Sequence, residues 1–488
     1  MAHQLSVCYL TSELAPFAKA GGLADVSTAL ARYLHGLGHD VRVFMPLYGA
    51  SVGAIGHLAA VEFLTDVPLR IGNNDLVFSV RTAPLPGAGP WVYFIDCPAL
   101  YHRATYYTED ADEHLRFILL CRATLEACQR MGWGPQIFHC NDWQSALIPL
   151  FLRTLYGWDK LFAKSRTLLG IHNIGYQGVF SSWTLGDLAL GGDAYLLHQD
   201  DLRAGMINFL KTGILYATAL VTVSPTYAQE ICTPTYGMGL DGLLRARREA
   251  LTGILNGVDY TEWNPETDPF IPFHFSRADL AGKEKNKREL LHRLGLDDVD
   301  GAPVLGIISR LVAQKGFDLL YTALPGIIRG RDLRLAVLGS GAVEYEEFFS
   351  RLQRENPGKV CFWQGFNNEL AHLIEAGADI FLMPSRYEPC GLNQMYSLKY
   401  GTIPVVRKTG GLADTVRHYN PTSGDGTGVV FEHYNHEAMN WALDTVLDLY
   451  INRQAWQHLR RNAMAEDFSW ERQGARYLEL YWHLAGPH

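Results

Sequence analysis

The 488-residue sequence has few of the features that mark membrane, secreted and nucleic-acid-binding proteins. Basic residues are fewer than acidic ones, 42 against 51, and the net charge of −9 argues against broad electrostatic binding to nucleic acid or anionic lipid. Apolar runs such as residues 217–223 stop far short of the roughly 18 to 20 residues of a membrane span. Residues 1–6 contain no Lys or Arg, which predicts neither a signal peptide nor a transit peptide. We therefore expect a cytoplasmic protein with no nucleic-acid or membrane partner.

Metal-binding and dinucleotide-binding motifs are also missing. The eight cysteines lack the spacing of metal ligands, and the closest pair, Cys121 and Cys128, is one helical heptad apart. We interpret them as reduced thiols of a cytosol-like compartment and expect neither a metal nor a cofactor. Neither glycine loop has the pattern Gly-x-Gly-x-x-Gly with a ribose-binding acid at the expected spacing, which argues against a nucleotide-dependent oxidoreductase.

Short apolar runs alternate with helix-length segments along the whole chain. Hydrophobic residues make up 48% of the sequence, which is typical of a compact chain with sizeable cores. The alternation predicts α/β architecture, with parallel sheets and helices on both faces. The predicted strands are residues 5–10, 40–45, 91–95, 137–140, 167–171 and 219–223, then 304–309, 333–339, 360–363, 380–384, 403–406 and 428–431.

The alternation breaks at residues 256–259, Asn-Gly-Val-Asp, before a Pro- and Phe-rich stretch. We predict two Rossmann-like, doubly wound lobes, an N-terminal one of residues 1–255 and a C-terminal one of residues 256–468. An amphipathic helix within residues 469–488 is expected to complete the first lobe. Because ligands of such sheets bind beyond the carboxyl ends of the strands, two such lobes are expected to face a deep cleft.

One glycine turn occurs twice, as Lys-Ala-Gly-Gly-Leu-Ala-Asp at residues 19–25 and as Lys-Thr-Gly-Gly-Leu-Ala-Asp at residues 408–414. Each copy follows a predicted strand and begins a predicted helix, so each would direct backbone N–H groups and a lysine at an anion. We favour the first copy, with Lys19 and Gly22, for chemistry and the second for structural support. A surface lysine beside a helix start is the alternative.

Two cations occupy a predicted strand-to-helix loop in the second half of the chain. Arg310 and Lys315 are five residues apart and can neutralise a pyrophosphate leaving group through charge-assisted hydrogen bonds. The alternative is an exposed basic loop. Their position at a strand end favours the functional interpretation.

Residues 384–394, Pro-Ser-Arg-Tyr-Glu-Pro-Cys-Gly-Leu-Asn-Gln, form a second candidate loop, with Glu388 before a turn. Four consecutive backbone N–H groups would point at a sugar or a phosphate, those of Cys390, Gly391, Leu392 and Asn393. A helix start with an exposed acid is the alternative. A nucleophilic role for the cysteine is disfavoured because no base is adjacent.

Polar residues also end two predicted strands in the first half. His139 and Cys140 are neighbours in a strand and point to opposite faces, which argues against a metal site. Capping of the next helix by Asn141 or Asp142 is the default interpretation. We propose Asp142 and His172 as site residues because several strand ends converge there.

Several aromatic side chains can stack on sugar rings, although most aromatics in any chain belong to the core. They are Tyr101, Tyr106, Tyr107, Trp143 and Trp183.

In order along the chain, these motifs resemble those of bacterial glycogen synthases and plant starch synthases, glycosyltransferase family 5. The resemblance covers nearly the whole chain through residues 19–25, 139–143, 172–173, 256–259, 309–316 and 384–392. It implies two lobes of the glycosyltransferase B type. It also implies an ADP-glucose-dependent glucosyltransferase that extends the non-reducing end of an α-1,4-glucan or maltooligosaccharide with retention of configuration.

The resemblance divides the candidate residues by role. It assigns Lys19, Arg310, Lys315 and the amides of residues 390–393 to the donor phosphates and glucose, Phe366 to the adenine, Glu388 to the glucose hydroxyls and developing positive charge, and Asp142 and His172 to the acceptor side. His172 is expected to offer its main-chain carbonyl to the reacting carbon.

Three positions depart from the family pattern. Ala20 stands where the family usually has Thr, Phe366 where it often has Tyr, and Tyr396 where the broader retaining pattern has a second glutamate. UDP-glucose as donor stays open, and so does a glucan-binding scaffold that has lost catalysis, although the intact set of charged site residues argues against the scaffold.

Overall fold

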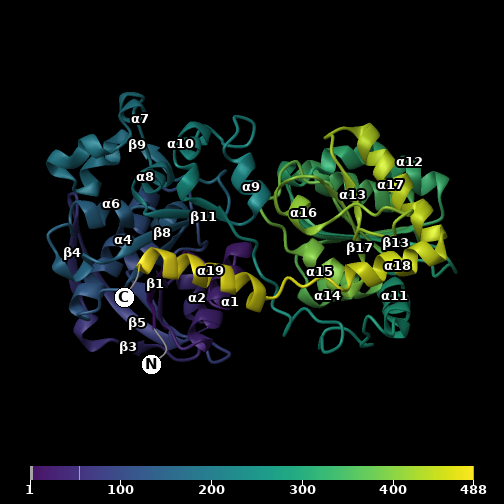
Figure 1. Ribbon diagram of the computed structural model, residues 1–488, viewed down its shortest axis with the longest axis horizontal. Coiled ribbons are helices and arrows are strands. Elements are labelled where there is room, and N and C mark those ends of the chain that lie inside the picture. Colours follow the sequence, from purple (N-terminus) through teal and green to yellow (C-terminus); the bar gives the residue numbers. More distant parts are fainter. Residues whose placement is uncertain (1–3, 54, 487–488) are drawn as a thin grey trace. The chain divides into compact units, whose positions relative to one another are not determined.

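The computed structural model describes residues 4–53 and 55–486. The expectation that residues 1–6 contain no signal or transit peptide falls partly on residues 1–3, which lie outside the described residues. The chain divides into two compact units, one of Met1–Val223, Ala228–Gly257 and Trp470–His488, the other of Ser224–Tyr227 and Val258–Ser469. Each is an α/β lobe around its own sheet (Figure 1).

A sheet that has ten strands among the described residues forms the centre of the first unit. Its order is β12 (Leu251–Gly253), β11 (Ala219–Thr222), β8 (Arg166–Ile171), β7 (Ile137–Asn141), β1 (Ser6–Leu10), β2 (Asp40–Pro46), β6 (Trp91–Asp96), β5 (Asn74–Pro84) and β3 (Ala59–Ala60), with β4 (Val67–Ile71) paired to β5. The strands from β12 to β6 are parallel. Central strands such as β1 and β7 are almost wholly buried because both of their faces are covered.

Helices lie on both sides of this sheet, and the C-terminal helix is one of them (Figure 1). The helices of this unit are α1 (Gly22–Gly36), α2 (Gly49–Val52), α3 (Pro98–Tyr101), α4 (Glu113–Arg130), α5 (Asp142–Ser145), α6 (Ile148–Arg153), α7 (Gln199–Arg203), α8 (Phe209–Tyr216), α10 (Asp241–Ala246) and α19 (Trp470–Ala485). Helix α9 (Pro225–Glu230) is divided between the two units. A separate pair of strands, β9 (Val179–Ser181) and β10 (Met206–Asn208), lies outside the main sheet.

Helix α19 packs on α1 and buries one side of its surface in the first unit. The Tyr481 hydroxyl lies 2.6 Å from Nδ1 of His139 in β7. Trp470 and Tyr477 are also buried, whereas Ala475, Leu478 and Leu480 are only half-buried. The helix therefore ties residues 470–485 to α1 and β7.

The sheet of the second unit is parallel and has six strands among the described residues, in the order β15 (Val360–Gln364), β14 (Arg334–Gly341), β13 (Val304–Leu311), β16 (Ile380–Met383), β17 (Ile403–Arg407) and β18 (Val429–Phe431). Figure 1 shows it between two layers of helices. One layer contains α12 (Leu320–Gly330), α13 (Val343–Glu355), α16 (Gly410–Thr415) and α17 (His436–Ile451), the other α11 (Ala281–Leu294), α14 (Asn368–Gly377), α15 (Asn393–Tyr400) and α18 (Arg453–Ala463).

The predicted architecture, two α/β lobes built on parallel sheets, is confirmed. One part of it was not predicted: residues 59–84 add antiparallel strands to the edge of the first sheet, where β5 pairs with β3, β4 and β6. Within residues 4–53 and 55–486, none of the helices combines the length and apolar character needed to cross a bilayer.

The chain passes into the second unit after Gly257 and returns to the first at Trp470. Within the second unit, the N–H of Val258 donates to the carbonyl oxygen of Phe468 at 2.7 Å. Within the first unit, a Cβ added to Gly257 would lie 2.6 Å from the indole of Trp470. The outgoing and returning segments therefore lie side by side.

Candidate functional site

The loop between β1 and α1 carries Lys19. Its Nζ forms an ion pair with Asp25 Oδ1 at 2.8 Å, and its side chain is 52% exposed. The backbone N–H groups of Ala20 and Gly21 donate to the carboxylate of Glu13 at 2.8 and 2.7 Å. The expectation that the N–H groups of this turn face an anion is therefore wrong for these two residues, because an internal acid already accepts them.

Gly22, the first residue of α1, differs from its two predecessors. It is exposed, and its N–H makes no hydrogen bond to another residue in the described ranges. Together with Lys19 it leaves one N–H donor and one ammonium group at the start of α1. That position suits an anion, since the N-terminus of a helix carries partial positive charge.

Glu13 is a buried acid that the sequence analysis missed. Its Oε2 accepts the two N–H groups of the glycine turn, and its Oε1 accepts the hydroxyl of Tyr107 at 2.8 Å. The same hydroxyl lies 2.8 Å from Ser12 Oγ, so Tyr107 serves as a hydrogen-bond partner here. An acid three residues after a buried strand is the only sequence signal for Glu13, because it belongs to none of the recognised motifs.

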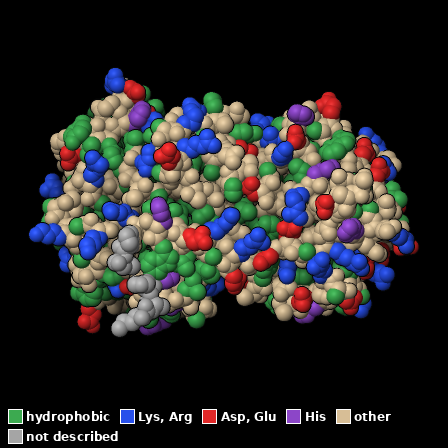
Figure 2. Space-filling view, viewed as in Figure 1, with side chains coloured by type: hydrophobic (Ala, Val, Ile, Leu, Met, Phe, Trp, Pro, Cys, Tyr) green, Lys and Arg blue, Asp and Glu red, His purple; other side chains and the backbone are tan. Residues whose placement is uncertain are grey.

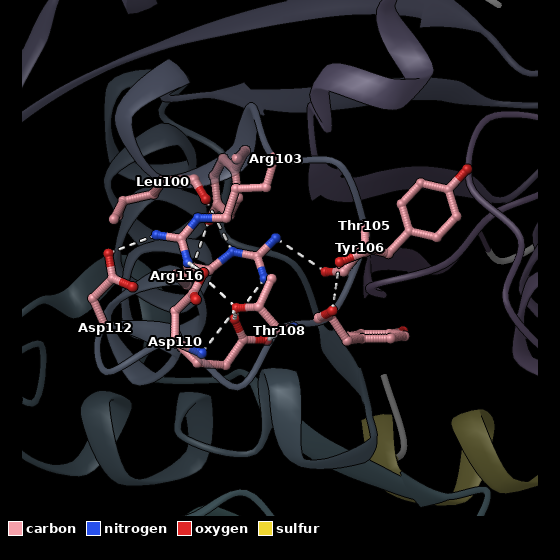
Figure 3. Close-up of polar contacts among 11 residues, drawn as sticks. Leu100, Arg103, Thr105, Tyr106, Thr108, Asp110, Asp112 and Arg116 are labelled. Carbon is pink, nitrogen blue, oxygen red and sulfur yellow. Dashed lines mark hydrogen bonds and ion pairs between the residues drawn. The ribbon is translucent and has the colours of Figure 1, made fainter.

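Two arginines hold the segment that carries Tyr107 (Figure 3). Arg116, fully buried in α4, donates to the carbonyl oxygens of Leu100 and Tyr106 at 2.9 and 3.0 Å. It also forms an ion pair with Glu113 at 2.6 Å. These contacts fix the backbone directly before Tyr107.

Arg103 fixes the other half of the same segment (Figure 3). It forms ion pairs with Asp110 and Asp112, both at 2.6 Å, and donates to Thr108 Oγ1 at 3.3 Å. Thr105 Oγ1 donates to the carbonyl oxygen of Tyr107 at 2.8 Å. Through Tyr107 and Glu13, this network supports the turn that carries Lys19.

The ends of β7 and β8 bring Asp142 and His172 together. Asp142 has a φ of 54°, and its Oδ1 accepts the backbone N–H of His172 at 2.7 Å. The His172 ring is held by Asn141, with Nε2 2.9 Å from Oδ1. Helix α5 begins without a side-chain cap, so the predicted capping role is wrong for both Asn141 and Asp142. Each side chain bonds to the neighbouring strand end instead.

Burial sets the ionisation of these groups. It raises the pKa of Asp142 to about 7, although hydrogen bonds from the backbone of His172 and Asn173 pull that pKa down. It lowers the pKa of His172 to about 4. Burial, with a smaller contribution from His172, lowers the pKa of His139 to about 3. Near neutral pH both imidazoles are therefore uncharged.

In the second unit, Arg310 lies close to the end of β13 and Lys315 in the turn that follows. Arg310 is exposed, and its side chain has neither an ion pair nor a hydrogen bond within the described part of the chain. Lys315 Nζ instead forms a largely buried ion pair with Glu388 Oε2 at 2.6 Å. Ser385 Oγ donates to the same oxygen at 3.0 Å. A lysine and an acid 73 residues apart thus meet at the strand ends.

The start of α15 presents backbone donors beside this ion pair. The N–H groups of Gly391, Leu392 and Asn393 make no hydrogen bond to any residue that the structure describes. Asn393 Nδ2 donates to the carbonyl oxygen of Ile308 at 2.7 Å, which holds the helix start against β13. Cys390 is buried. Free N–H groups at a helix start, close on the chain to Glu388 and its Lys315 partner, are suited to an anion.

The second copy of the glycine turn packs under the Glu388 loop. The N–H of Gly411 donates to the carbonyl oxygen of Glu388 at 3.1 Å. A Cβ on Gly410 or Gly411 would lie 2.0 Å from the carbonyl oxygen of Glu388 or Cys390, respectively. Lys408 forms an exposed ion pair with Glu432. These contacts agree with the structural role expected for this copy.

The aromatic candidates are divided between surface and core. Phe366 and Trp183 are 81% and 94% exposed. Tyr101 and Trp143 are buried, and the Tyr101 hydroxyl donates to a backbone carbonyl oxygen.

Tyr396 stacks on Trp263 with ring centroids 4.0 Å apart and an interplanar angle of 2°. Its position, where the broader pattern has a glutamate, thus has a packing role.

Across the described residues, no group of three or more His, Cys, Asp or Glu side chains is arranged to hold a metal ion. The structure brings Asp142 and His172 together in the first unit. In the second unit it brings together Lys315 and Glu388.

Two protein families match the chain, one in each half. Residues 6–246 match the family described as the starch synthase catalytic domain, and residues 295–463 match glycosyl transferases group 1. Among similar proteins is the glycogen synthase of Koribacter versatilis (strain Ellin345), 45% identical over 484 residues that cover 98% of each chain. Glycogen synthase 1 of Geobacter sulfurreducens is 43% identical, covering 98% of this chain and 96% of its own.

Two solved structures are also similar to this chain. The catalytic domain of starch synthase IV from Arabidopsis thaliana, bound to ADP and acarbose, is similar with a TM-score of 0.91 and 34% identity, covering 99% of this chain and all of that one. Sucrose-phosphate synthase from Thermosynechococcus elongatus has a TM-score of 0.60 at 16% identity over 99% of each chain, which supports the fold alone.

Proposed function

Because this chain belongs to the family of glycogen synthases and starch synthases, with the glycosyltransferase B fold, we propose that it is an ADP-glucose-dependent α-1,4-glucan glucosyltransferase. The glucose is added to the non-reducing end of the glucan with retention of configuration. The second unit holds the donor and the first unit the acceptor. The observation that carries this proposal is the Lys315–Glu388 ion pair beside the free N–H groups of α15.

The donor assignment follows from charge. Arg310 and Lys315 supply two positive charges, and residues 391–393 supply three unpaired N–H groups, which together suit a pyrophosphate. Starch synthase IV binds ADP in its solved structure, and we propose the same nucleotide for this chain. The exposed ring of Phe366 is proposed to stack on the adenine.

Glu388 is proposed to orient the glucose hydroxyls and stabilise positive charge at the reacting carbon. Retaining hydrolases use two carboxyl groups about 5 Å apart, one of them as nucleophile. Glu388 is paired with Lys315 and Ser385 in the described part of the chain, not with a second carboxyl group. We therefore propose substitution on one face of the sugar through an oxocarbenium-like state.

In this reaction the bond from glucose C1 to the phosphate oxygen breaks, and a bond from C1 to the acceptor oxygen forms on the same face. ADP leaves with the bonding electrons, and its terminal phosphate takes the proton of the acceptor hydroxyl. Arg310 and Lys315 stabilise the negative charge on the departing phosphate. Lys19 contacts the donor phosphate and sugar.

The acceptor assignment rests on the strand ends of the first unit. Asp142 fixes the backbone at His172 through the 2.7 Å hydrogen bond, which we propose keeps the His172 carbonyl directed at the reacting carbon. Acarbose, bound by starch synthase IV, supports an oligosaccharide acceptor. The eight cysteines are free thiols, which supports a reducing, cytoplasmic compartment.

The first test is incorporation of labelled glucose from ADP-glucose or UDP-glucose into a maltooligosaccharide. We expect incorporation from ADP-glucose, with UDP-glucose the poorer donor. Glucan binding without incorporation from either donor would support the scaffold alternative and contradict the proposal. Incorporation mainly from UDP-glucose would correct the donor.

The second test replaces Glu388 with Gln, which keeps the shape of the side chain and removes its charge. We expect turnover to fall by about 10²-fold or more, as for other preorganised electrostatic groups. Glu369→Gln, in an exposed ion pair with Arg293, is the matched control and should keep full turnover. Nearly normal turnover in Glu388→Gln would contradict the role assigned to this residue.

A further inference from the structure

A cavity of about 270 Å³ lies in the second unit between the start of α11 and the surface of α18. None of the residues assigned to donor or acceptor lines it. Its polar lining consists of Arg277, Glu284, Gln457, Arg460 and Arg461, and its remaining wall is formed by apolar residues at the start of α11. Three arginines thus surround one small cavity.

Arg460 is a buried charge with too little compensation. The residue is only 8% exposed, and its Nε is buried without a hydrogen-bond partner among the described residues. Its guanidinium has a single hydrogen bond within the described ranges, at 3.4 Å to Glu284 Oε1. The Glu284 side chain is itself half exposed. Burying a charge is costly unless it is paired and fully hydrogen-bonded, so a second anion at this place would stabilise the protein.

The other two arginines reinforce the positive charge. Arg277 and Arg461 are exposed, and neither makes an ion pair or a hydrogen bond with any residue in the described ranges. Three guanidinium groups against one carboxylate leave an excess of two positive charges around the cavity. Figure 2 shows Lys and Arg side chains gathered over the part of the second unit where Figure 1 draws α11 and α18.

The positive charge of Arg460 also affects the neighbouring Lys283. It is buried in the first turn of α11, and its pKa is lowered to about 7, chiefly by burial, with Asp379 raising the pKa and the positive charge of Arg460 adding a smaller lowering. Its Nζ donates to Thr402 Oγ1 at 2.7 Å. An anion beside Arg460 would oppose the repulsion between these two cations.

The helix start does not account for the site. The first N–H of α11, at Ala281, already donates to Asp279 Oδ1 at 2.9 Å. The arginine side chains therefore define the ligand. Planar guanidinium groups bind carboxylate and phosphate oxygens through paired hydrogen bonds, and an excess of two charges matches a dianion.

We propose that this cavity binds a small phosphate-bearing anion, held by Arg277, Arg460 and Arg461, at a site separate from the donor and acceptor sites. The volume is slightly below the roughly 300 Å³ at which small-molecule sites begin, which favours free phosphate or a small phosphate ester over a nucleotide. Glu284 is the internal group that the anion displaces from Arg460.

The test is isothermal titration calorimetry of the full chain with inorganic phosphate and with glycerol 3-phosphate, at constant ionic strength. The double variant Arg277→Ala/Arg461→Ala changes exposed side chains only, and we expect it to weaken binding by about tenfold or more, since hydrogen bonds to charged groups are strong. Glu284→Gln removes the competing carboxylate and is expected to tighten binding. Arg453→Ala, an exposed change on α18 outside the cavity, is the matched control.

Phosphate can also bind where the donor pyrophosphate is proposed, so Arg310→Ala is measured in parallel. Weaker binding in the double variant with normal binding in Arg310→Ala supports the cavity. Tighter binding of glycerol 3-phosphate than of phosphate then indicates an organic ester as the ligand, and equal binding indicates free phosphate. The proposal is overturned if neither anion binds at millimolar concentration, or if binding is lost in Arg310→Ala and unchanged in the double variant.

Discussion

Glu13 supports the Lys19 turn without belonging to any recognised motif, and its replacement tests whether that support matters. Its carboxylate accepts three hydrogen bonds, at 2.8, 2.7 and 2.8 Å, from Ala20, Gly21 and Tyr107. Each bond contributes about 1 kcal/mol net, since the donors lie near the surface and regain water once the acid is removed. Glu13→Ala is therefore expected to lower the free energy of unfolding by about 3 kcal/mol, and Glu13→Gln, which keeps an acceptor oxygen, by about 1 kcal/mol.

The expected effect on catalysis is larger than the effect on stability. Lys19 is proposed to contact the donor phosphate, and a small displacement of a positioning group costs up to about 10²-fold in rate. We expect kcat/KM for ADP-glucose to fall by about that factor in Glu13→Ala, with a rise in KM for ADP-glucose and partial rescue in Glu13→Gln. Urea denaturation and initial-rate kinetics measure the two quantities.

Glu109→Ala is the matched control, because Glu109 is exposed in the same segment as Tyr107 and makes no ion pair or hydrogen bond within the described residues. It should leave both quantities unchanged. If Glu13→Ala lowers stability but leaves kcat/KM and KM intact, the turn does not depend on Glu13 for its function. Unchanged stability as well would refute the structural argument.

Three further predictions concern stability and are measured by urea denaturation. Arg116→Met removes a fully buried guanidinium and leaves the buried Glu113 carboxylate without its cation, which should cost about 3 to 5 kcal/mol. The raised pKa of Asp142 means that the folded chain holds a proton which the unfolded chain releases, so stability should fall as the pH rises from about 4 to about 7, and Asp142→Asn should lack this decline. The corresponding glycines of the two turns should differ in how much an alanine destabilises the fold. Gly410 has a φ of 43°, and a Cβ there would lie 2.0 Å from the Glu388 carbonyl oxygen, so Gly410→Ala should lower the free energy of unfolding by more than about 2 kcal/mol. Gly21 has open space around it, so Gly21→Ala should lower it by less than about 0.5 kcal/mol. A loss of stability well below about 3 kcal/mol in Arg116→Met would contradict the role of its ion pair. A pH profile of stability shared by Asp142→Asn and the parent would contradict the raised pKa, and equal losses in the two glycine variants would contradict the close contact at Gly410.

Much of the fold could be predicted because its strands are buried on both faces. Strands such as β1, β7 and the first half of β13 are mostly apolar and buried, and α4 occupies residues 113–130 between two predicted strands. The antiparallel strands β4 and β5 escaped prediction because one of their faces meets solvent, so polar and apolar residues alternate. Pro68 within β4 and the Asn residues that follow it also resemble a loop.

The sequence indicated candidate site residues one by one, but not which of them would contact each other. Lys315 and Glu388 were both candidates, yet their ion pair joins loops of different strands and depends on the order of strands in the sheet. The capping role expected for Asp142 was wrong because the N–H of His172, 30 residues away, is the partner that its carboxylate meets. Spacing along the sequence predicts only partners that are close on the chain, and here a hydrogen bond to a distant residue takes the place of the expected helix cap.

The paired junctions of the chain make residues 258–469, the main part of the second unit, an insertion within the first unit. Val258 and Phe468 are hydrogen-bonded across the base of the insertion, and Gly257 packs on Trp470 on the other side of the junctions. A short linker from residue 257 to residue 470 would therefore span the gap left if the insertion were excised. The same junctions offer fusion points at which residues 258–469 can be exchanged as one segment for those of a relative.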